Sequence, residues 1–313
     1  MRLDIRTDTS ERLVTPTQWS RRYLELFAAW LHQPSSQRQH YTERGGNALK
    51  VVCISDTHGT KPQVPYGDIL LHAGDMSRGG TFKEIQEQLD WLNAQPHLHK
   101  LVIGGNHDII LDEVAVERII ETRSDSFPAG GKRRKDLQWG SIMYLEDSFV
   151  TLQFPQHKRS IKIFGSPMTP QYGNWAFQHL PIRDVWRDKI PHDTDILVTH
   201  GPPKAHLDSS ELGITAGCPH LLRALHYARP RIHVFGHIHA GHGLETIRFD
   251  KATVAYERIV VLGEGLGMLL SLLWASAMKL VCNDAGHETV LVNAAAVKGN
   301  HGEEQMPAII ITI

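Results

Sequence analysis

From Leu49 onward, short apolar runs alternate with segments of helical periodicity. The apolar runs read LKVVCIS, DILLHAG, KLVIGG, SIKIFGS, DILVTHG, RIHVFGH, TVLVNAA and AIIITI. Between the second and third runs, the segment TFKEIQEQLDWLNAQP has one apolar helical face, and Thr81 and Glu84 have the spacing of an N-terminal capping box. Apolar strands that alternate with helices predict an α/β domain with buried sheet strands.

The first 48 residues follow a different pattern. In residues 17–33, Trp19, Tyr23, Phe27 and Trp30 recur at helical spacing, which predicts an amphipathic helix that packs on the main domain through this aromatic stripe. The polar stretch PSSQRQHYTERGGN follows and predicts a linker. We therefore expect an N-terminal extension at residues 1–48 and one larger domain at residues 49–313.

A hydrophobic insert lies at about residues 260–280, and its apolar part reads GLGMLLSLLWASAM. This part is shorter than the roughly 18–20 residues that a membrane-spanning helix needs, and Lys279 ends it. Strand-like runs on both sides also argue against a crossing. We expect a buried helix or one that faces a partner or a second copy, and weak attachment to a membrane surface stays open as the alternative.

Composition narrows the class of protein. The chain has 313 residues, of which 41% are hydrophobic and 21% charged, so it can bury a sizeable core. The net charge of -1 gives no electrostatic case for a specific nucleic-acid partner. The 3 cysteines, Cys53, Cys218 and Cys282, show no paired spacing, and the N-terminus is charged where a signal peptide would be apolar. We expect a cytoplasmic protein.

The 20 histidines are the compositional outlier, and several of them follow the apolar runs directly. Five runs end in side chains that can bind metal or move protons: Asp56 and His58, Asp75, Asn106 and His107, His200, and His237 and His239. Ligands of α/β sheets bind outside the carboxyl ends of the strands, so these groups can meet in one cleft. Carboxylate, amide and imidazole donors without thiolate favour Mn, Fe or Zn, and the set is large enough for two ions that share a bridging carboxylate.

These residues form a motif series that resembles the calcineurin-like metallophosphoesterases. The series reads SDTHG, AGDMSRGG, GGNHD, VTHGPP and FGHIH, in the order of that family's motifs. The segments GDMSRGG, SPMTPQYGNWAF and THGPP are similar to the branch that includes the metallophosphoesterase-domain-containing proteins. The resemblance covers residues 49–258 and the final strands. It implies a four-layer αββα sandwich of two mixed sheets flanked by helices.

The resemblance also implies roles for individual residues. One metal ion would be held by Asp56, His58, Asp75 and His239. The other would be held by Asp75, Asn106, His200 and His237, with Asp75 bridging. His107 is the motif histidine that no metal needs, and the resemblance assigns it to the leaving group, as general acid or charge stabiliser.

Residues near these motifs are candidates for the substrate pocket. Arg78 could meet a phosphate oxygen or form a structural salt bridge. Asn106 and Asn174 could contact the substrate, whereas Trp175 and Phe177 could line the pocket or pack in the core. Asp108 has the sequence context of a helix N-cap, because IILDEVAVERII follows it.

The function that follows is a phosphoesterase with two metal ions, acting as a phosphodiesterase on a small molecule or nucleotide. A water bridging the ions would lose a proton near neutral pH, and the hydroxide would attack phosphorus in line. Two alternatives stay open: a hydrolase for an ester, amide or carbon–carbon bond, and a non-catalytic scaffold. A nuclease is disfavoured by the missing basic stripe, and a protein phosphatase by the reading GDMSRGG.

Overall fold

The computed structural model describes residues 16–32, 48–120, 131–211, 213–279, 287–298 and 304–313. The chain divides into two compact units. The larger unit comprises Pro34–Phe249 and Gly286–Ile313, and the smaller one comprises Met1–Gln33 and Asp250–Ala285. The predicted linker at residues 34–47 lies outside the described residues, as does Cys282. The domain boundary after residue 48 stays a prediction.

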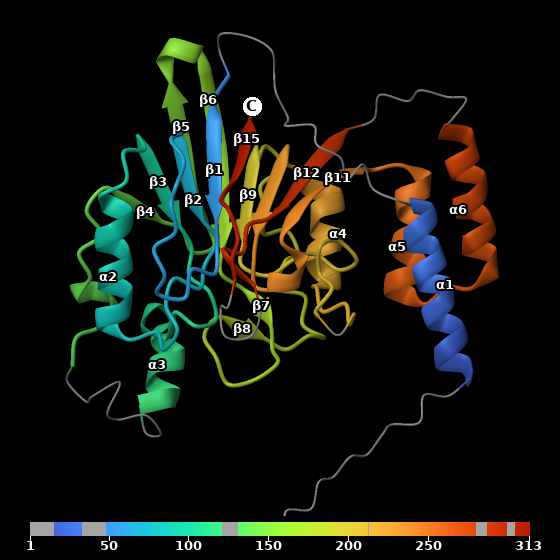
Figure 1. Ribbon diagram of the computed structural model, residues 1–313, viewed down its shortest axis with the longest axis horizontal. Coiled ribbons are helices and arrows are strands. Elements are labelled where there is room, and N and C mark those ends of the chain that lie inside the picture. Colours follow the sequence, from blue (N-terminus) through green and yellow to red (C-terminus); the bar gives the residue numbers. More distant parts are fainter. Residues whose placement is uncertain (1–15, 33–47, 121–130, 212, 280–286, 299–303) are drawn as a thin grey trace, which may run out of the picture. The chain divides into compact units, whose positions relative to one another are not determined.

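Two mixed sheets form the centre of the larger unit (Figure 1). The first has the order β15-β1-β2-β3-β4, and β15 is antiparallel to β1 while the other neighbours are parallel. Its strands are β1 (Lys50–Ile54), β2 (Ile69–His72), β3 (His99–Val102), β4 (Ile142–Tyr144) and β15 (Ile309–Thr312).

The second sheet has the order β11-β12-β10-β9-β6-β5. The four central strands are parallel, and the edge strands β5 and β11 are antiparallel to their neighbours. Its strands are β5 (Ser148–Phe154), β6 (Arg159–Ser166), β9 (Ile196–Thr199), β10 (Ile232–Phe235), β11 (Gly243–Arg248) and β12 (Glu288–Asn293).

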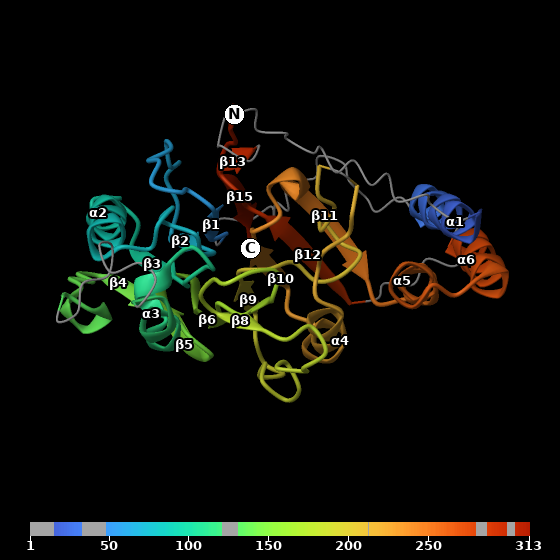
Figure 2. The ribbon, with the colours of Figure 1, turned by 90° about the horizontal axis from the view of Figure 1, so that it is seen from below.

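Side-chain alternation along the strands builds a core on each face of the sheets. In β1, Val51 and Cys53 belong to the core between the two sheets, while Val52 and Ile54 belong to the core under the helices. Helices α2 (Phe82–Asn93) and α3 (Glu113–Ile120) cover the first sheet, and α4 (Pro219–Ala228) covers the second (Figure 2). The expected four-layer αββα sandwich is confirmed.

Short elements complete the larger unit. The Thr81 side chain accepts a hydrogen bond from the Glu84 backbone N–H, and the Glu84 side chain accepts one from the Thr81 backbone N–H. The predicted capping box of α2 is therefore present. Two strand pairs lie outside the main sheets: β7 (Thr169–Pro170) with β8 (Gln178–His179), and β13 (Val297–Lys298) with β14 (Glu304–Gln305). The 3₁₀ turns are Ile109–Leu111, Arg134–Asp136, Pro155–His157 and His239–Gly241.

The smaller unit consists of α1 (Pro16–His32), α5 (Lys251–Leu262) and α6 (Leu266–Lys279). It has its own core, with Ala28, Ala252, Ala255, Ile259 and Leu272 at its centre. The hydrophobic insert predicted at about residues 260–280 corresponds to the end of α5 and to α6. No helix among the described residues is both long and apolar enough to cross a bilayer.

The aromatic stripe of α1 differs from the prediction. Tyr23, Phe27 and Trp30 are exposed, and the Trp19 side chain lies outside the described part of the structure. The helix packs through Leu24, Ala28 and Leu31 instead. Both sets of residues recur at helical spacing, and the smaller side chains allow the three helices to approach closely.

Candidate metal centre

The predicted ligands follow five strands from both sheets and meet at one place. Asp56 and His58 follow β1, Asp75 follows β2, and Asn106 follows β3. His200 follows β9, and His237 and His239 follow β10. Ligand atoms within each of two groups lie no more than 4.8 Å apart: Asp56, His58 and His239 in one, and Asp75, His200 and His237 in the other.

Four of these residues have a left-handed backbone. The φ angles are 51° at Asp56, 44° at His58, 55° at Asp75 and 67° at His237. Residues other than glycine rarely adopt this conformation, and where it persists the surrounding structure must enforce it. Such strain is common at functional sites, and these four residues are among the eleven described non-glycine residues with a positive φ.

Asp75 belongs to the second group and also faces His58 of the first. Its Oδ2 atom is 3.9 Å from His58 Nε2 and 3.3 Å from His200 Nε2. In the first group, His239 Nε2 lies 3.3 Å from His58 Nε2 and 3.4 Å from Asp56 Oδ1. In the second, Asn106 Oδ1 lies 3.0 Å from His200 Nε2. One carboxylate therefore faces both groups, as a bridging ligand would.

The side-chain atoms that converge at this site are suited to bind a cation. His58 Nδ1 lies 3.2 Å from the Ser77 carbonyl oxygen, and His200 Nδ1 lies 2.9 Å from that of Ala73. If each Nδ1–H donates to its carbonyl, each Nε2 presents a lone pair toward carboxylate or amide oxygens, which also only accept. Acceptors that converge in this way are stabilised by a positive charge between them, which a bound metal ion would supply.

The pKa values of His200 and His237 also indicate that a positive charge is favoured beside Asp75. Burial opposes a charge on His200, but the Asp75 carboxylate outweighs burial and raises the pKa of His200 to about 9. A cation beside Asp75 would take the place of that proton. Burial and the neighbouring His200 lower the pKa of His237 to about 4, so His237 is a neutral imidazole that can bind metal at pH 7.

Backbone amides and glycines fix the two carboxylates. The His237 backbone N–H donates to Asp56 Oδ2 at 2.9 Å, and that of His107 donates to Asp75 Oδ1 at 2.7 Å. A Cβ added to Gly236 would lie 1.9 Å from Asp56 Oδ2. The carboxylate thus occupies the space that a side chain at position 236 would fill, which explains the glycine of the FGHIH motif.

Asp108 does not cap a helix, contrary to the sequence prediction. No side-chain cap bond forms at the 3₁₀ turn that follows it, and α3 begins only at Glu113. The Asp108 carboxylate instead accepts hydrogen bonds from the backbone N–H groups of Gly105, Met76 and Ser77. It therefore ties the loop after β3 to the loop after β2, and so positions Asn106 relative to Asp75.

His107 and Arg78 lie beside the ligands. His107 Nδ1 is 2.8 Å from the Arg78 carbonyl oxygen, and the His107 ring is 4.9 Å from the His58 ring between centroids. Arg78 Nε donates to the His58 carbonyl oxygen at 3.0 Å, and the side chain is exposed. Among the described residues no salt bridge of Arg78 is present, so its guanidinium stays available at the rim.

The segment after β7 forms one wall of the site. The Trp175 ring packs on His107 with 4.3 Å between centroids, whereas Phe177 is buried in the core. Asn174 is exposed, and no hydrogen bond between it and a proposed ligand is present among the described residues.

Tyr172, which the sequence analysis missed, lies at the ligands instead. Its hydroxyl is 3.1 Å from Asn106 Nδ2, and its ring centroid is 5.4 Å from that of His237. The sequence offers only its place two residues before Asn174 as a signal.

Comparisons with known proteins agree with this geometry. A metallophosphoesterase domain-containing protein 1 of Homo sapiens is 38% identical over 208 residues, which are 62% of this chain and 62% of that protein. A probable rhamnogalacturonate lyase C of Emericella nidulans is 42% identical over 272 residues, which are 85% of this chain but 24% of that protein. A UPF0046 protein of Caenorhabditis elegans is 35% identical over 223 residues, covering 65% of this chain and 54% of that protein.

The chain thus spans only part of the length of each of these relatives. The family model that matches is the calcineurin-like phosphoesterase model, over residues 49–241. That range contains all seven predicted metal ligands, so the resemblance drawn from the motifs is confirmed. The chain belongs to the calcineurin-like phosphoesterase family.

Proposed function

We propose that the protein is a phosphodiesterase that acts on a small molecule or nucleotide with two divalent transition-metal ions, Mn, Fe or Zn. The observation that carries this proposal is the position of Asp75. Its carboxylate faces His58 in one ligand group and His200 in the other, at 3.9 Å and 3.3 Å. A single carboxylate shared by two groups of metal-binding side chains would hold two ions close together, as in the two-metal sites of phosphoester hydrolysis, where the ions lie about 3.5–4 Å apart.

The ligand set supports an anionic substrate. Asp56 and Asp75 are the only carboxylates among the seven proposed ligands, and the imidazoles and the Asn106 amide are neutral. When bound, two divalent ions would lower the pKa of a water and neutralise charge on the phosphoryl oxygens. Two carboxylates leave the charge of two such ions only partly balanced, so the site would attract a phosphate diester.

His107 is placed to serve the leaving group. Its Nδ1 atom is held by the Arg78 carbonyl oxygen and its ring by Trp175, so the imidazole is fixed beside the ligands without belonging to the proposed set. An oriented imidazole can donate a proton to a departing alkoxide or stabilise its charge. The exposed guanidinium of Arg78 could bind a phosphate oxygen from the same side.

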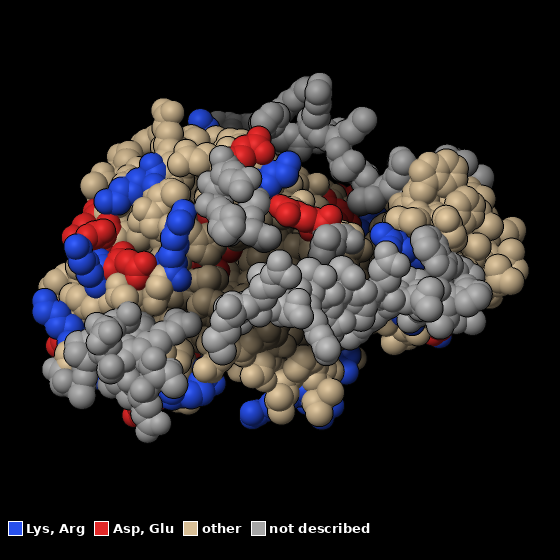
Figure 3. Space-filling model, turned by 60° about the horizontal axis from the view of Figure 1, so that its bottom comes forward, with Lys and Arg blue, Asp and Glu red and all other residues tan. Residues whose placement is uncertain are grey.

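The substrate is expected to be a free small molecule. On the face shown in Figure 3, the described basic and acidic side chains are interspersed, and the net charge of the chain is -1. A nucleic-acid partner would call for a continuous basic stripe. The lyase among the relatives shares a region that is only 24% of its length, so the activity in its name gives no reason to prefer a sugar substrate here.

The experiment that tests the proposal is hydrolysis of bis-p-nitrophenyl phosphate by chelator-stripped protein with Mn²⁺, Fe²⁺, Zn²⁺ or buffer added back. Metal-dependent turnover should be lost in His237→Ala and Asn106→Ala, and retained in the matched control His192→Ala, whose side chain is exposed and outside the site. Folded protein that holds about two metal ions and yet shows no turnover would overturn the proposal. A screen of carboxylic esters and amides would then test the alternative hydrolase.

A further inference from the structure

The three-helix unit carries a large share of the exposed apolar side chains. Among the described residues, 21 large hydrophobic side chains are exposed, and 11 of them lie on α1, α5 and α6. Soluble monomers rarely expose a large contiguous apolar patch, and where one occurs it usually marks a contact with a protein or a membrane. The three helices are therefore the place to look for an interaction surface.

On α6, the exposed apolar side chains lie opposite the core of the unit. The helix packs into that core through Met268, Leu269, Leu272 and Ala275. Its exposed apolar residues are Leu266, Leu270, Leu273, Trp274 and Met278. Leu266, Leu270 and Leu273 follow each other at intervals of four and three residues, which places them on one side of a helix. Residues 265–278 contain no charged side chain, so α6 is apolar on its outer side as well as on its core side.

On α1, Tyr23, Leu26, Phe27 and Trp30 form a second exposed apolar stripe. The rings of Phe27 and Trp30 stack with 5.7 Å between their centroids. The α1 helix contacts α6, and the two helices lie side by side and run in the same direction (Figure 1, Figure 2). Both stripes thus belong to one pair of neighbouring helices.

Helical geometry turns the two stripes to the same side. On α1, Tyr23 and Phe27 directly precede core residues, whereas on α6, Leu270 and Leu273 directly follow core residues. In neighbouring helices that run in the same direction, these opposite offsets rotate the stripes away from the core in opposite senses. Both stripes then point to the outer side of the α1–α6 pair, where Figure 3 shows an area without charged side chains. We call these nine residues the outer face.

The outer face is large enough for a stable contact between two proteins. Its residues are between 38% and 72% exposed. Aromatic side chains bury about 150–250 Å² each when they are covered, so nine large side chains at this exposure offer on the order of 900 Å². A standard-size interface takes about 800 Å² from each partner. The available area therefore matches what a stable dimer needs.

The charges around the outer face favour a second copy of the chain over a membrane. Residues 16–32 and 250–279 contain five basic and four acidic residues. Two of the basic residues are already paired, Arg21 with Glu25 and Arg258 with Glu264, each at 2.9 Å. A helix that lies on an anionic membrane carries an excess of Lys and Arg, which these segments lack. An almost neutral apolar face can instead meet an identical face without repulsion between like charges.

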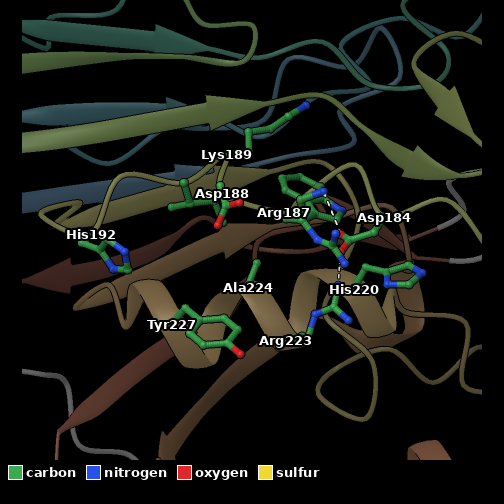
Figure 4. A pocket seen from close by; sticks show the side chains of 11 residues that line it. Asp184, Arg187, Asp188, Lys189, His192, His220, Arg223, Ala224 and Tyr227 are labelled. Carbon is green, nitrogen blue, oxygen red and sulfur yellow. Dashed lines mark hydrogen bonds and ion pairs between the residues drawn. The ribbon is translucent and has the colours of Figure 1, made fainter.

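The surface of α4 shows the contrasting case of an exposed aromatic side chain among polar neighbours (Figure 4). There Tyr227 lines a cavity of about 430 Å³, in which Arg187 and Arg223 converge on Asp184. Tyr227 and Trp274 are both 71% exposed. Tyr227 is thus a matched control for Trp274, because it is an equally exposed aromatic side chain on a helix outside the outer face.

We propose that the outer face binds the outer face of a second copy of the chain, so that the protein is a homodimer. A face that binds itself forms a closed contact around a twofold axis, which is the commonest symmetry of soluble oligomers. Trp30 and Trp274, the largest side chains of the outer face, would be its buried anchors. The proposal concerns the three-helix unit alone and holds whether or not the metal centre hydrolyses phosphodiesters.

The test is sedimentation equilibrium of the full chain over a range of concentrations. The unmodified protein should have twice the mass of one chain. Trp274→Glu and Trp30→Glu should each raise the Kd of the dimer about 30-fold, because each removes an anchor and buries a carboxylate. Tyr227→Glu should leave the Kd unchanged. All three side chains are exposed, so circular dichroism should show that the variants fold like the unmodified protein.

A chain that stays monomeric at about 100 μM would overturn the proposal, since interfaces of this size have micromolar or tighter affinity. A dimer whose Kd is the same with Trp274→Glu or Trp30→Glu as without it would overturn it as well. Flotation with vesicles of phosphatidylcholine, with and without phosphatidylserine, tests the membrane. A monomer that floats with either kind of vesicle, and no longer does so with Trp274→Glu, would assign the outer face to a lipid surface instead.

Discussion

At the scale of single residues, Tyr172 shows how one hydroxyl can orient a ligand. The Tyr172 hydroxyl lies 3.1 Å from Asn106 Nδ2, and this contact directs Asn106 Oδ1 toward His200. Loss of such a bond costs about 1 kcal/mol, so Tyr172→Phe should lower kcat/KM for the aryl diester about fivefold and weaken Mn²⁺ binding to a similar degree. Steady-state kinetics and metal titration would measure both.

Tyr227→Phe is the matched control, because Tyr227 is exposed on α4 and contacts none of the proposed ligands. Equal kinetics for Tyr172→Phe and Tyr227→Phe would mean that the Asn106 amide is oriented without the Tyr172 hydroxyl.

Gly236 gives a prediction about metal content. The Cβ of Gly236→Ala would lie 1.9 Å from Asp56 Oδ2 and 2.2 Å from Ser55 Oγ, so Asp56 must move away from the first ligand group. We expect this variant to bind fewer metal ions than the roughly two expected for the unmodified chain, as measured by plasma mass spectrometry after dialysis.

Gly267→Ala serves as the reference for Gly236→Ala, because an added Cβ in α6 meets no atom within 4 Å. It should keep the full metal content and could gain up to about 1 kcal/mol of helix stability. Full metal content in Gly236→Ala would show that the loop after β10 shifts without disturbing Asp56.

The sequence predicts the metal centre better than its surroundings, for a physical reason. Asp56, Asp75 and His200 each follow an apolar strand directly, so the strand fixes where the side chain goes. Tyr172 and Asn174 lie in an irregular segment two residues apart, and only the folded backbone decides that Tyr172 turns toward Asn106.

At the scale of elements, β10 carries a buried histidine, His233, that we expect to make the protein sensitive to acid. His233 Nε2 lies 2.8 Å from Thr199 Oγ1, and burial lowers the pKa of His233 to about 3. The unfolded chain, with an ordinary histidine pKa of about 6.5, binds more protons than the folded chain between these values. The free energy of unfolding therefore falls as the pH decreases through that window.

The expected contribution of His233 between pH 7 and pH 5 is a loss of about 2 kcal/mol. His233→Leu should remove about this much of the difference between urea unfolding curves at the two pH values. Chelator in every sample keeps metal release out of the comparison. An unchanged difference in His233→Leu would place the acid sensitivity elsewhere.

The eight apolar runs all correspond to strands, among them the edge strand β15, but the edge strands β4, β5 and β11 were not foreseen. In β5, buried positions are few and exposed ones alternate with half-buried ones, because one edge and one face of this strand lack neighbours. Such a strand has no continuous apolar run to detect. The start of α3 was placed too early for a different reason, since Ile109 and Ile110 are buried in a 3₁₀ turn rather than in the helix.

At the scale of the whole molecule, the three-helix unit has a core separate from those of the sandwich. Ala28 is fully buried at the centre of this core, so Ala28→Asp places a charge among apolar side chains. We expect this variant to become sensitive to proteolysis within α1, α5 and α6 while it keeps its metal ions and its diester hydrolysis. Mass spectrometry of the fragments and a metal assay would measure the two effects.

Ala277→Asp makes the same substitution at an exposed position of α6 and should change neither property. Loss of metal in Ala28→Asp would instead show that both units unfold together.

The segment that connects β11 to β12 can be replaced without changing the sheet. These strands are antiparallel neighbours, and Arg248 pairs with Glu288 at the end of their ladder, so the chain re-enters the sheet where it left. A tight turn would close that ladder as well as the long excursion through residues 250–285 does. Evolution or protein engineering can therefore shorten, lengthen or replace residues 250–285 without shifting the register of any strand that bears a metal ligand.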